Sequence, residues 1–313
     1  MVVLGAESVL LMALRLLKWP EKRLEKTGVP DKLRHFRLVY GVHLDSFMEA
    51  AEDLDTSPDE EIRALLPYGV QMPYMLMACH WLKNYIVEAK MRDTFDFSEP
   101  TIRKYCHLYS RCLQLQKQYK VRQGGRYCQL AESLTVPRKI IFEYGRENFI
   151  LTVDGTHCPT HEPRNAPSAL WYSHKFKGPG VAYEIAVSIR DSRIMWTNGP
   201  YPAGTNDKKI FNMGLVDEIP DGKAGIADNG YKRQPKLSLV NKQDSEEVAK
   251  FKDRALGRHE TVNNKLKSFA ILSHKFRHLG TGDEVLERHK VVFEAVAVLV
   301  QYDMENASPM YDV

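Results

Sequence analysis

Two short stretches decide the fold: residues 149–154 read FILTVD, and residues 224–228 read AGIAD. Each is a run of mostly apolar residues of the length of a buried strand, and each stops at an aspartate that small or turn-forming residues follow. A carboxylate at the carboxyl end of a strand in an α/β sheet faces a crevice where ligands bind. If the two strands are parallel neighbours, Asp154 and Asp228 lie side by side.

The rest of the second half alternates strand and helix patterns. Residues 181–189 alternate in hydrophobicity with a period of two, which predicts a half-buried strand. The remaining expected elements are a strand over 193–197 and helices over 206–216, 244–272 and 283–302. The order β-β-β-α-β-α-α predicts an α/β fold with a sheet flanked by helices.

A third acid lies in the long expected helix. Val262, Leu266 and Phe269 share one face, which we expect to pack on the sheet. Glu260 lies about 200° of helix rotation from Val262, at the edge of that face, from which it could reach the strand ends. Three converging carboxylates require a cation, and hard oxygen ligands suit Mg²⁺ or Mn²⁺. Taken singly, each acid has a plainer interpretation as a cap, turn or surface residue.

Five motifs follow one another in the second half of the chain: VDGTHCP at 153–159, YEIAVSI at 183–189, GPYPAGTNDKKIF at 199–211, GIADNGYK at 225–232 and RHETVNNKLKSFAIL at 258–272. This ordered set resembles the DDE endonuclease domain of PIF/Harbinger-type transposases over residues 140–313, and more weakly from residue 70.

The resemblance implies a ribonuclease H-like fold, two divalent metal ions, and cleavage and transfer of DNA strands. It also implies that Asp154, Asp228 and Glu260 are the catalytic, metal-binding triad; the 32-residue step from Asp228 to Glu260 resembles the family's short spacing. Members of this family are often assisted by a separate Myb-like DNA-binding protein. We further expect a nuclear protein that forms a homo-oligomer.

The first half of the chain has helical spacing, and we divide it into an N-terminal helical region, 1–70, and a helix-turn-helix-like region, 71–140, ahead of the endonuclease domain, 141–313. Helices are expected over 74–85 and 87–95, and Ser98 is a good N-cap for a third. That third helix would be the recognition helix, with Thr101 near bases. A plain helical bundle with a basic surface explains the pattern equally well.

Net charge is concentrated in one part of the chain. Residues 71–148 hold 13 Lys and Arg against 7 acids, whereas the whole protein has a net charge of only +4. Such clustering is typical of a surface that binds a polyanion such as DNA, although a solvated helix face has the same composition. The predicted DNA contacts are Arg103, Lys104, Arg111, Lys175, Arg258 and Lys267.

Several other classes of protein are disfavoured. The five cysteines form no CxxC pair, and the spacing of His157, Cys158 and His161 matches no common zinc site. The apolar N-terminal run is too short to span a bilayer, so we expect a packed amphipathic helix and no membrane association. Asp207 is interpreted as a helix cap.

Two alternatives to a nuclease stay open. A domesticated DNA-binding or interaction protein could retain the transposase fold without its catalysis, although the intact acids favour an enzyme. A carboxylate-pair hydrolase such as a glycosidase would need two acids and no metal, and no other feature supports it.

Overall fold

The computed structural model describes residues 5–121, 148–164, 166–191, 193–241, 244–277 and 280–311. The chain forms two compact units. The first, called the helical unit, comprises Met1–Lys120, Leu266–His274 and Val291–Pro309. The second, called the sheet unit, comprises Val121–Lys265, Lys275–Lys290 and Met310–Val313. Helices from both sides of residue 70 therefore share one unit, and the expected boundary near residue 140 lies outside the described residues.

The helical unit is built from short helices. These are α1 (Ala6–Leu16), α2 (Glu21–Lys26), α3 (Val29–Tyr40), α4 (Leu44–Asp55), α5 (Glu60–Leu65), α6 (Met72–Asn84), α7 (Glu88–Phe95), α8 (Glu99–Leu115), α9 (Lys117–Lys120), α16 (Ala270–Ser273) and the later part of α17 (Gly282–Asn306). The expected amphipathic N-terminal helix is confirmed, since α1 buries Val9, Leu10, Ala13 and Leu14. Within the described ranges, no helix is both long and apolar enough to cross a membrane.

The three helices of the expected helix-turn-helix region are confirmed as helices. Asp96 ends α7 in the left-handed conformation, and the side chain of Ser98 accepts a hydrogen bond from the backbone N–H of Thr101 at 3.3 Å, at the start of α8. A small core joins the three: Met77, Met91, Phe95, Ile102 and Cys106. The geometry accounts for the helices and their packing; DNA recognition by them stays a prediction.

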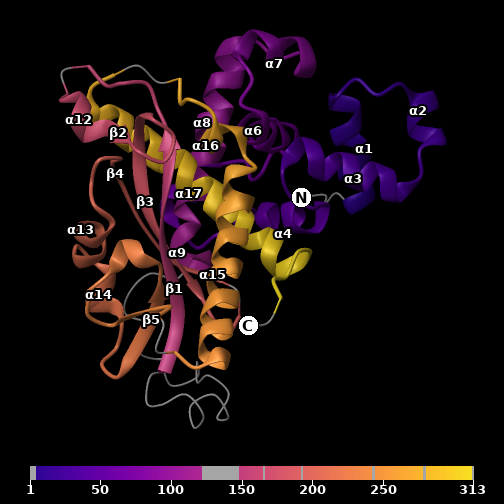
Figure 1. The fold of residues 1–313 in the computed structure, drawn as a ribbon. Coiled ribbons are helices and arrows are strands. Elements are labelled where there is room, and N and C mark those ends of the chain that lie inside the picture. The colour runs from indigo at the N-terminus through magenta and orange to yellow at the C-terminus, as the bar shows by residue number, and fades with distance from the viewer. Residues whose placement is uncertain are drawn as a thin grey trace. The chain divides into compact units, whose positions relative to one another are not determined.

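The sheet unit contains one mixed sheet (Figure 1). Its strands are β1 (Asn148–Pro159), β2 (Tyr172–Ser173), β3 (Gly178–Ser188), β4 (Ile194–Pro202), β5 (Lys223–Ala227) and β6 (Leu237–Leu239). They follow the order β2-β3-β1-β5-β6, with β4 paired to β3. β1 is antiparallel to β3 and parallel to β5, as the expectation of neighbouring parallel strands requires. This mixed α/β arrangement fits the ribonuclease H-like fold.

Helices cover both faces of the sheet. α13 (Asp207–Asn212) and α14 (Leu215–Glu218) lie along one face, and α15 (Glu246–Lys267) lies along the other (Figure 1). On the first face, Phe211 and Leu215 pack against Leu151 and Val153 of β1. On the second, Ala255 of α15 packs in a cluster with strand residues.

This double cover corrects the prediction for β3, which is not half-buried. Both of its sets of alternating residues are buried: Val181, Tyr183, Ile185 and Val187 on one face, and Ala182, Glu184, Ala186 and Ser188 on the other. The second set looks polar in sequence, but three of its members are small, so helices can pack closely over them. Alanine and serine fit a buried face and an exposed face equally well, so the alternation in sequence does not show which face of β3 is exposed.

Two expected helices are shorter than the sequence pattern indicates. The helix expected over 206–216 breaks into α13 and α14 at Gly214, where a Cβ atom would lie 2.9 Å from the ring of Trp196. The long helix ends at Lys267, and Phe269 caps the short α16. Val262, Leu266 and Phe269 are buried as expected. Phe269, however, packs in the helical unit, against Gly41 and under Lys83, and not on the sheet.

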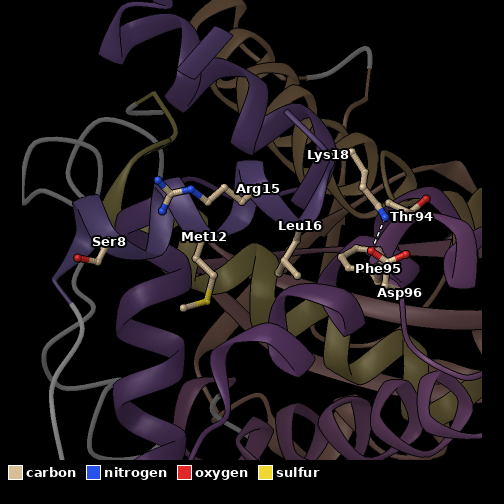
Figure 2. Close-up of a pocket in the computed structure, with 8 residues that line it drawn as sticks. All are labelled: Ser8, Met12, Arg15, Leu16, Lys18, Thr94, Phe95 and Asp96. Carbon is tan, nitrogen blue, oxygen red and sulfur yellow. Dashed lines mark hydrogen bonds and ion pairs between the residues drawn. The ribbon is translucent and has the colours of Figure 1, made fainter. Parts of the chain in front are cut away.

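A surface pocket of about 370 Å³ lies within the helical unit, between α1 and the end of α7. In Figure 2, Leu16 is drawn between Met12 and the ion pair of Lys18 with Asp96. The other residues that line it are Ser8, Arg15, Thr94 and Phe95. Its lining includes a single carboxylate, which is already paired, so the pocket offers no acid cluster for metal-dependent chemistry.

Lys117 provides a test of what holds the helical unit together. Its Nζ lies 2.5 Å from Oε1 of Glu294 on α17, and the two side chains are 10% and 7% exposed. We expect Lys117→Ala to lower the free energy of unfolding by about 3–5 kcal/mol, because it leaves a buried carboxylate without its cation. Urea denaturation of the full chain measures the change.

The control is Arg34→Ala, which removes an exposed partner of Asp31, with side chains 83% and 62% exposed. Its effect should stay within about 0.5 kcal/mol. Equal, small effects of the two substitutions would show that the buried pair does not hold α9 to α17.

Candidate active site

The two predicted aspartates are brought together by the pairing of β1 with β5. The last paired residues in this parallel ladder are Val153 and Ala227, so Asp154 and Asp228 are the next residues on neighbouring strands. Paired strands lie about 4.8 Å apart, which sets the spacing of the two backbones. The prediction that Asp154 ends its strand is wrong, because β1 continues in its ladder with β3 to Pro159. Asp154 lies instead where β5 stops.

Backbone and side-chain donors orient both carboxylates. Asp154 Oδ1 accepts a hydrogen bond from the backbone N–H of Gly155 at 2.7 Å, and its Oδ2 accepts one from Nδ2 of Asn263 at 3.0 Å. Asp228 Oδ1 accepts from the backbone N–H of Gly230 at 2.8 Å. Asp228 is exposed and Asp154 is partly buried, so solvent and ligands have access to the pair.

α15 faces Asp154 with an amide and not with the predicted acid. Asn263 is 4% exposed and holds Asp154, and His259 is 2% exposed and lies with its Nδ1 2.8 Å from Oγ1 of Thr152. Glu260, between them in sequence, is exposed. Within the described ranges, no group of three or more His, Cys, Asp or Glu side chains is arranged to hold a metal ion. Convergence of Glu260 on the two aspartates therefore stays a prediction.

Asp207 is a further acid near this site, and its interpretation as a helix cap is wrong. The cap of α13 is Asn206, whose side chain accepts a hydrogen bond from the backbone N–H of Lys208. Asp207 is half-buried, and its Oδ1 lies 2.5 Å from the position that a Cβ atom on Gly155 would take. Burial raises the pKa of Asp207, Lys175 lowers it, and the charges of Asp154 and Asp228 raise it. The one signal in the sequence was that Asn206 already suffices as a cap.

Two buried groups lie close to Asp207 and were also missed. Glu184 is 1% exposed; its Oε1 accepts a hydrogen bond from Trp196 Nε1 at 3.2 Å, and its Oε2 has no partner within the described residues. Burial raises the pKa of Glu184 to about 8, the bond from Trp196 lowers it, and the charge of Asp207 raises it. The hydroxyl of Tyr231, also 1% exposed, has no described partner either. A lone acid in an alternating strand gives no sign that it is buried.

Three predicted DNA contacts belong to the second half of the chain. Lys175 is exposed and its Nζ donates to the backbone oxygen of Gly155 at 2.6 Å, beside Asp154. Lys267 is exposed at the end of α15. Arg258, in contrast, is 1% exposed and donates to the backbone oxygen of Ser188 at 2.7 Å. Its guanidinium ties α15 to β3, which argues against the predicted phosphate contact.

The other three lie on α8, where much of the positive charge is already paired. Arg103 binds Glu88, with Nη2 and Oε2 2.5 Å apart, and Arg111 binds Glu61 at 2.9 Å. Lys104 lies over the ring of Tyr105 at 5.2 Å and has no carboxylate partner in the part of the chain that the structure describes. Lys104 is therefore the most available of the three for a phosphate.

The histidine and cysteine motif at 157–161 has a structural role. His157 is 9% exposed, and its Nδ1 lies 2.7 Å from the hydroxyl of Ser173 on β2. Cys158 is buried in β1, where its neighbours point to the opposite face. Alternation along β1 separates the side chains of His157 and Cys158, so these two do not face one metal site.

The oxygen atoms of the acids around the end of the β1–β5 ladder are of the chemical type that a hard cation prefers. Asp154, Asp207 and Asp228 supply only carboxylate oxygens, which Mg²⁺ and Mn²⁺ prefer, and the charges of Asp154 and Asp228 both act on Asp207. No soft sulfur ligand lies among these three. The residues that would hold such an ion are therefore Asp154 and Asp228, where the β1–β5 ladder stops; within the described residues no third His, Cys, Asp or Glu side chain completes a metal-binding group with them.

Comparison with known proteins gives one match. A family model described as DDE superfamily endonuclease matches residues 153–301, a segment that includes Asp154, Asp207, Asp228 and Glu260. Endonucleases of this family generally use divalent metal ions. No curated protein and no solved structure matches the chain. The match supports transposase-like nuclease chemistry for the sheet unit.

The raised pKa of Glu184 predicts how stability depends on pH. The unfolded chain releases this proton near pH 4.5, whereas the folded chain keeps it to about pH 8. Unfolding between those values releases a proton, so stability should fall as the pH rises, by at most about 1.4 kcal/mol per pH unit. Glu184→Gln should flatten this part of the curve, as measured by urea denaturation across the window.

Glu218→Gln on α14 is the control, because Glu218 lies outside the buried group and its replacement should leave the wild-type slope unchanged. A wild-type slope in Glu184→Gln would mean that Glu184 is ionised in the folded chain at neutral pH.

Proposed function

We propose that this protein is a metal-dependent DNA endonuclease of the transposase type that cleaves and transfers DNA strands. The observation that carries the proposal is the placement of Asp154 and Asp228 at the end of the β1–β5 ladder, within the segment that matches the DDE superfamily endonuclease family. Two carboxylates on neighbouring strands, side by side where their ladder stops and accessible from solvent, provide anionic oxygen ligands of the kind that a divalent ion prefers.

The chain's own residues would bind the metal and position the DNA. Asp154 is held by Asn263 and by the N–H of Gly155, so its carboxylate is oriented before any ligand arrives. Glu260 is exposed on the same helix and would complete the triad by turning toward the strand ends. A pair of divalent ions would supply activation of the attacking hydroxyl and charge neutralisation at the phosphodiester. Lys175, beside Asp154, would contact a phosphate of the bound strand.

The finer assignment rests on the ordered motifs of the second half of the chain. They support a PIF/Harbinger-type transposase that works in the nucleus on transposon ends and target DNA. A Myb-like DNA-binding partner and self-association belong to the same proposal, because transposon ends must be held in pairs for strand transfer.

The alternative is a DNA-binding or interaction protein that retains the fold without catalysis. One observation favours it: no three metal-ligating side chains within the described residues are arranged to hold an ion. The two proposals differ in what the acids do. If the protein only binds DNA, replacing the acids leaves DNA binding unchanged, and the wild type itself does not cleave DNA.

Single replacement of the predicted triad tests catalysis. Asp154→Asn, Asp228→Asn and Glu260→Gln should each lower the rate of cleavage of a DNA duplex in Mg²⁺ or Mn²⁺ by at least about 100-fold, or about 2.7 kcal/mol of transition-state stabilisation. DNA affinity should survive, because the acids hold metal and do not contact DNA directly. Cleavage of labelled duplex, and binding measured in Ca²⁺, give the two readouts.

Asp217→Asn, at an exposed acid of α14, is the matched control and should cleave like the wild type. Retained cleavage by any one triad variant would remove that residue from the triad. Cleavage by the wild type in the presence of a chelator would contradict the metal mechanism, and absence of cleavage by the wild type in both metals would favour the non-catalytic alternative.

Salt dependence tests the DNA contacts. Lys175→Ala and Lys104→Ala should each weaken DNA binding and reduce the slope of log affinity against log salt concentration by about 0.9, the value for one lost phosphate contact. Lys250→Ala is the control, since Lys250 is an exposed partner of Glu246 on α15 and should leave the slope unchanged. An unaltered slope in Lys175→Ala would exclude its phosphate contact.

A further inference from the structure

We propose that α2 and α3 form a DNA-binding surface of the helical unit, which holds the phosphate backbone of a duplex through Lys22, Lys26 and Lys32. The inference rests on the proposed function, from which it takes DNA as the polyanion. It deepens that function by naming a further place where the chain holds its substrate. None of the six DNA contacts predicted from the sequence lies in this part of the chain.

The charges near the N-terminus are divided between two segments. Residues 15–37 hold eight Lys and Arg against three acids, whereas residues 44–61 hold eight acids and no Lys or Arg. Over residues 1–70 together there are 9 Lys and Arg against 12 acids, so the sum conceals the basic segment. The basic segment contains α2 and α3, and the acidic segment contains α4. Clustered positive charge is typical of a surface that binds a polyanion.

The acidic segment pairs with cations elsewhere in the helical unit. Nζ of Lys120 on α9 lies 2.6 Å from Glu49 Oε1 and 3.6 Å from Asp53 Oδ2. Glu61 binds Arg111 on α8 at 2.9 Å. The acids of α4 and α5 therefore neutralise charge on α8 and α9, and these pairs leave the charge of α2 and α3 in place.

Three lysines of α2 and α3 are available to a ligand. Lys22 and Lys26 are exposed, Lys32 is partly exposed, and none of the three has a carboxylate partner within the described residues. Lys22 and Lys26 are four residues apart, so they lie on the same face of α2. Each such ammonium group can replace a condensed counterion at a DNA phosphate, which is the main source of affinity in binding that is independent of sequence.

The ring of Trp19 holds α2 and α3 together. Trp19 is 8% exposed, the guanidinium of Arg23 on α2 lies 3.6 Å from its ring centroid, and the ring of His35 on α3 lies 4.8 Å from it. Leu24, 2% exposed, anchors the other side of α2 in the core. Because one buried ring contacts residues of both helices, their lysines are placed before DNA arrives, and binding has less of the chain to order.

α8 offers less free charge than its sequence indicates. Arg103 and Arg111 are bound to Glu88 and Glu61, and of the three predicted contacts on α8 only Lys104 has no carboxylate partner among the described residues. DNA binding by the helical unit should therefore depend more on α2 and α3 than on α8.

The triple variant Lys22→Gln/Lys26→Gln/Lys32→Gln tests this surface in the full chain. Its binding to a labelled duplex of random sequence in Ca²⁺ is measured by fluorescence anisotropy at salt concentrations between about 50 and 200 mM. The slope of log affinity against log salt concentration should shrink by about 2.7, three times the value of about 0.9 for one phosphate contact. Affinity at about 0.1 M salt should fall at least about tenfold.

Two control variants separate charge from fold. Lys22→Arg/Lys26→Arg/Lys32→Arg keeps the charge and should keep the wild-type slope. Arg63→Gln removes an exposed cation of the acidic helix α5 and should also leave the slope unchanged. The glutamine variant should melt at the wild-type temperature, because its three lysines make no ion pair in the described part of the fold. Loss of affinity in the arginine variant, together with a lower Tm, would mean that the lysines act through the fold and would overturn the inference.

The remaining outcomes distinguish the two levels of the proposal. An unchanged slope in the glutamine variant would overturn the inference and leave the proposed function standing, and a reduced slope in Lys104→Ala beside it would assign the contacts to α8. Weaker binding of the glutamine variant to phosphatidylserine vesicles, with DNA affinity retained, would assign the surface to a membrane and also overturn the inference. If the wild type binds no duplex at any of these salt concentrations, DNA is the wrong partner, and the proposed function fails together with the inference.

Discussion

The parallel pairing of β1 with β5 is the constraint on which the candidate site depends. Because Val153 is opposite Ala227, the next residue on each strand is an aspartate, and a shift of one residue in either strand would turn one carboxylate to the other face. The register is held from both sides. Leu151 and Val153 pack under α13 and α14, and Phe149 packs with Ile226 and Ala255 under α15. The apolar core thus fixes the distance between two charges that repel each other.

That repulsion explains the unusual composition of the surroundings. Glycine follows Asp154 directly and follows Asp228 after one residue; a Cβ atom on Gly155 would lie 2.5 Å from Asp207 Oδ1, and one on Gly230 would lie 2.9 Å from Asp228 Oδ1. The N–H groups of the same two glycines donate to the aspartates. Each glycine therefore serves the site twice, through the donor that it supplies and through the space that it leaves. The buried Glu184 nearby avoids adding to the charge by holding its proton to about pH 8.

Much of this fold could be predicted from the sequence, because strand periodicity and helix caps are local. The runs at 149–154 and 224–228 and the cap at Ser98 are examples. The failures have a common cause in contacts between distant segments. An arginine is usually a surface residue, but Arg258 is buried, and its guanidinium donates a hydrogen bond to the backbone oxygen of Ser188. β1 continues past Asp154 because β3 offers a partner for residues that look like a turn. Neither partner is near in sequence.

The rotation of α15 about its own axis determines which of its side chains faces Asp154. Asn263 and Glu260 are three residues apart, so they differ by about 60° around the helix and about 4.5 Å along it. Asn263 occupies the position that touches Asp154, and a neutral amide there donates a hydrogen bond where an acid would add a fourth negative charge. Glu260 is displaced toward solvent, where its charge costs little without metal. A long side chain on the exposed edge of a helix can turn inward once a cation compensates its charge. The fold therefore holds Asp154 and Asp228 where the β1–β5 ladder stops, and keeps the acid of α15 on an exposed side chain, so that its approach depends on what binds.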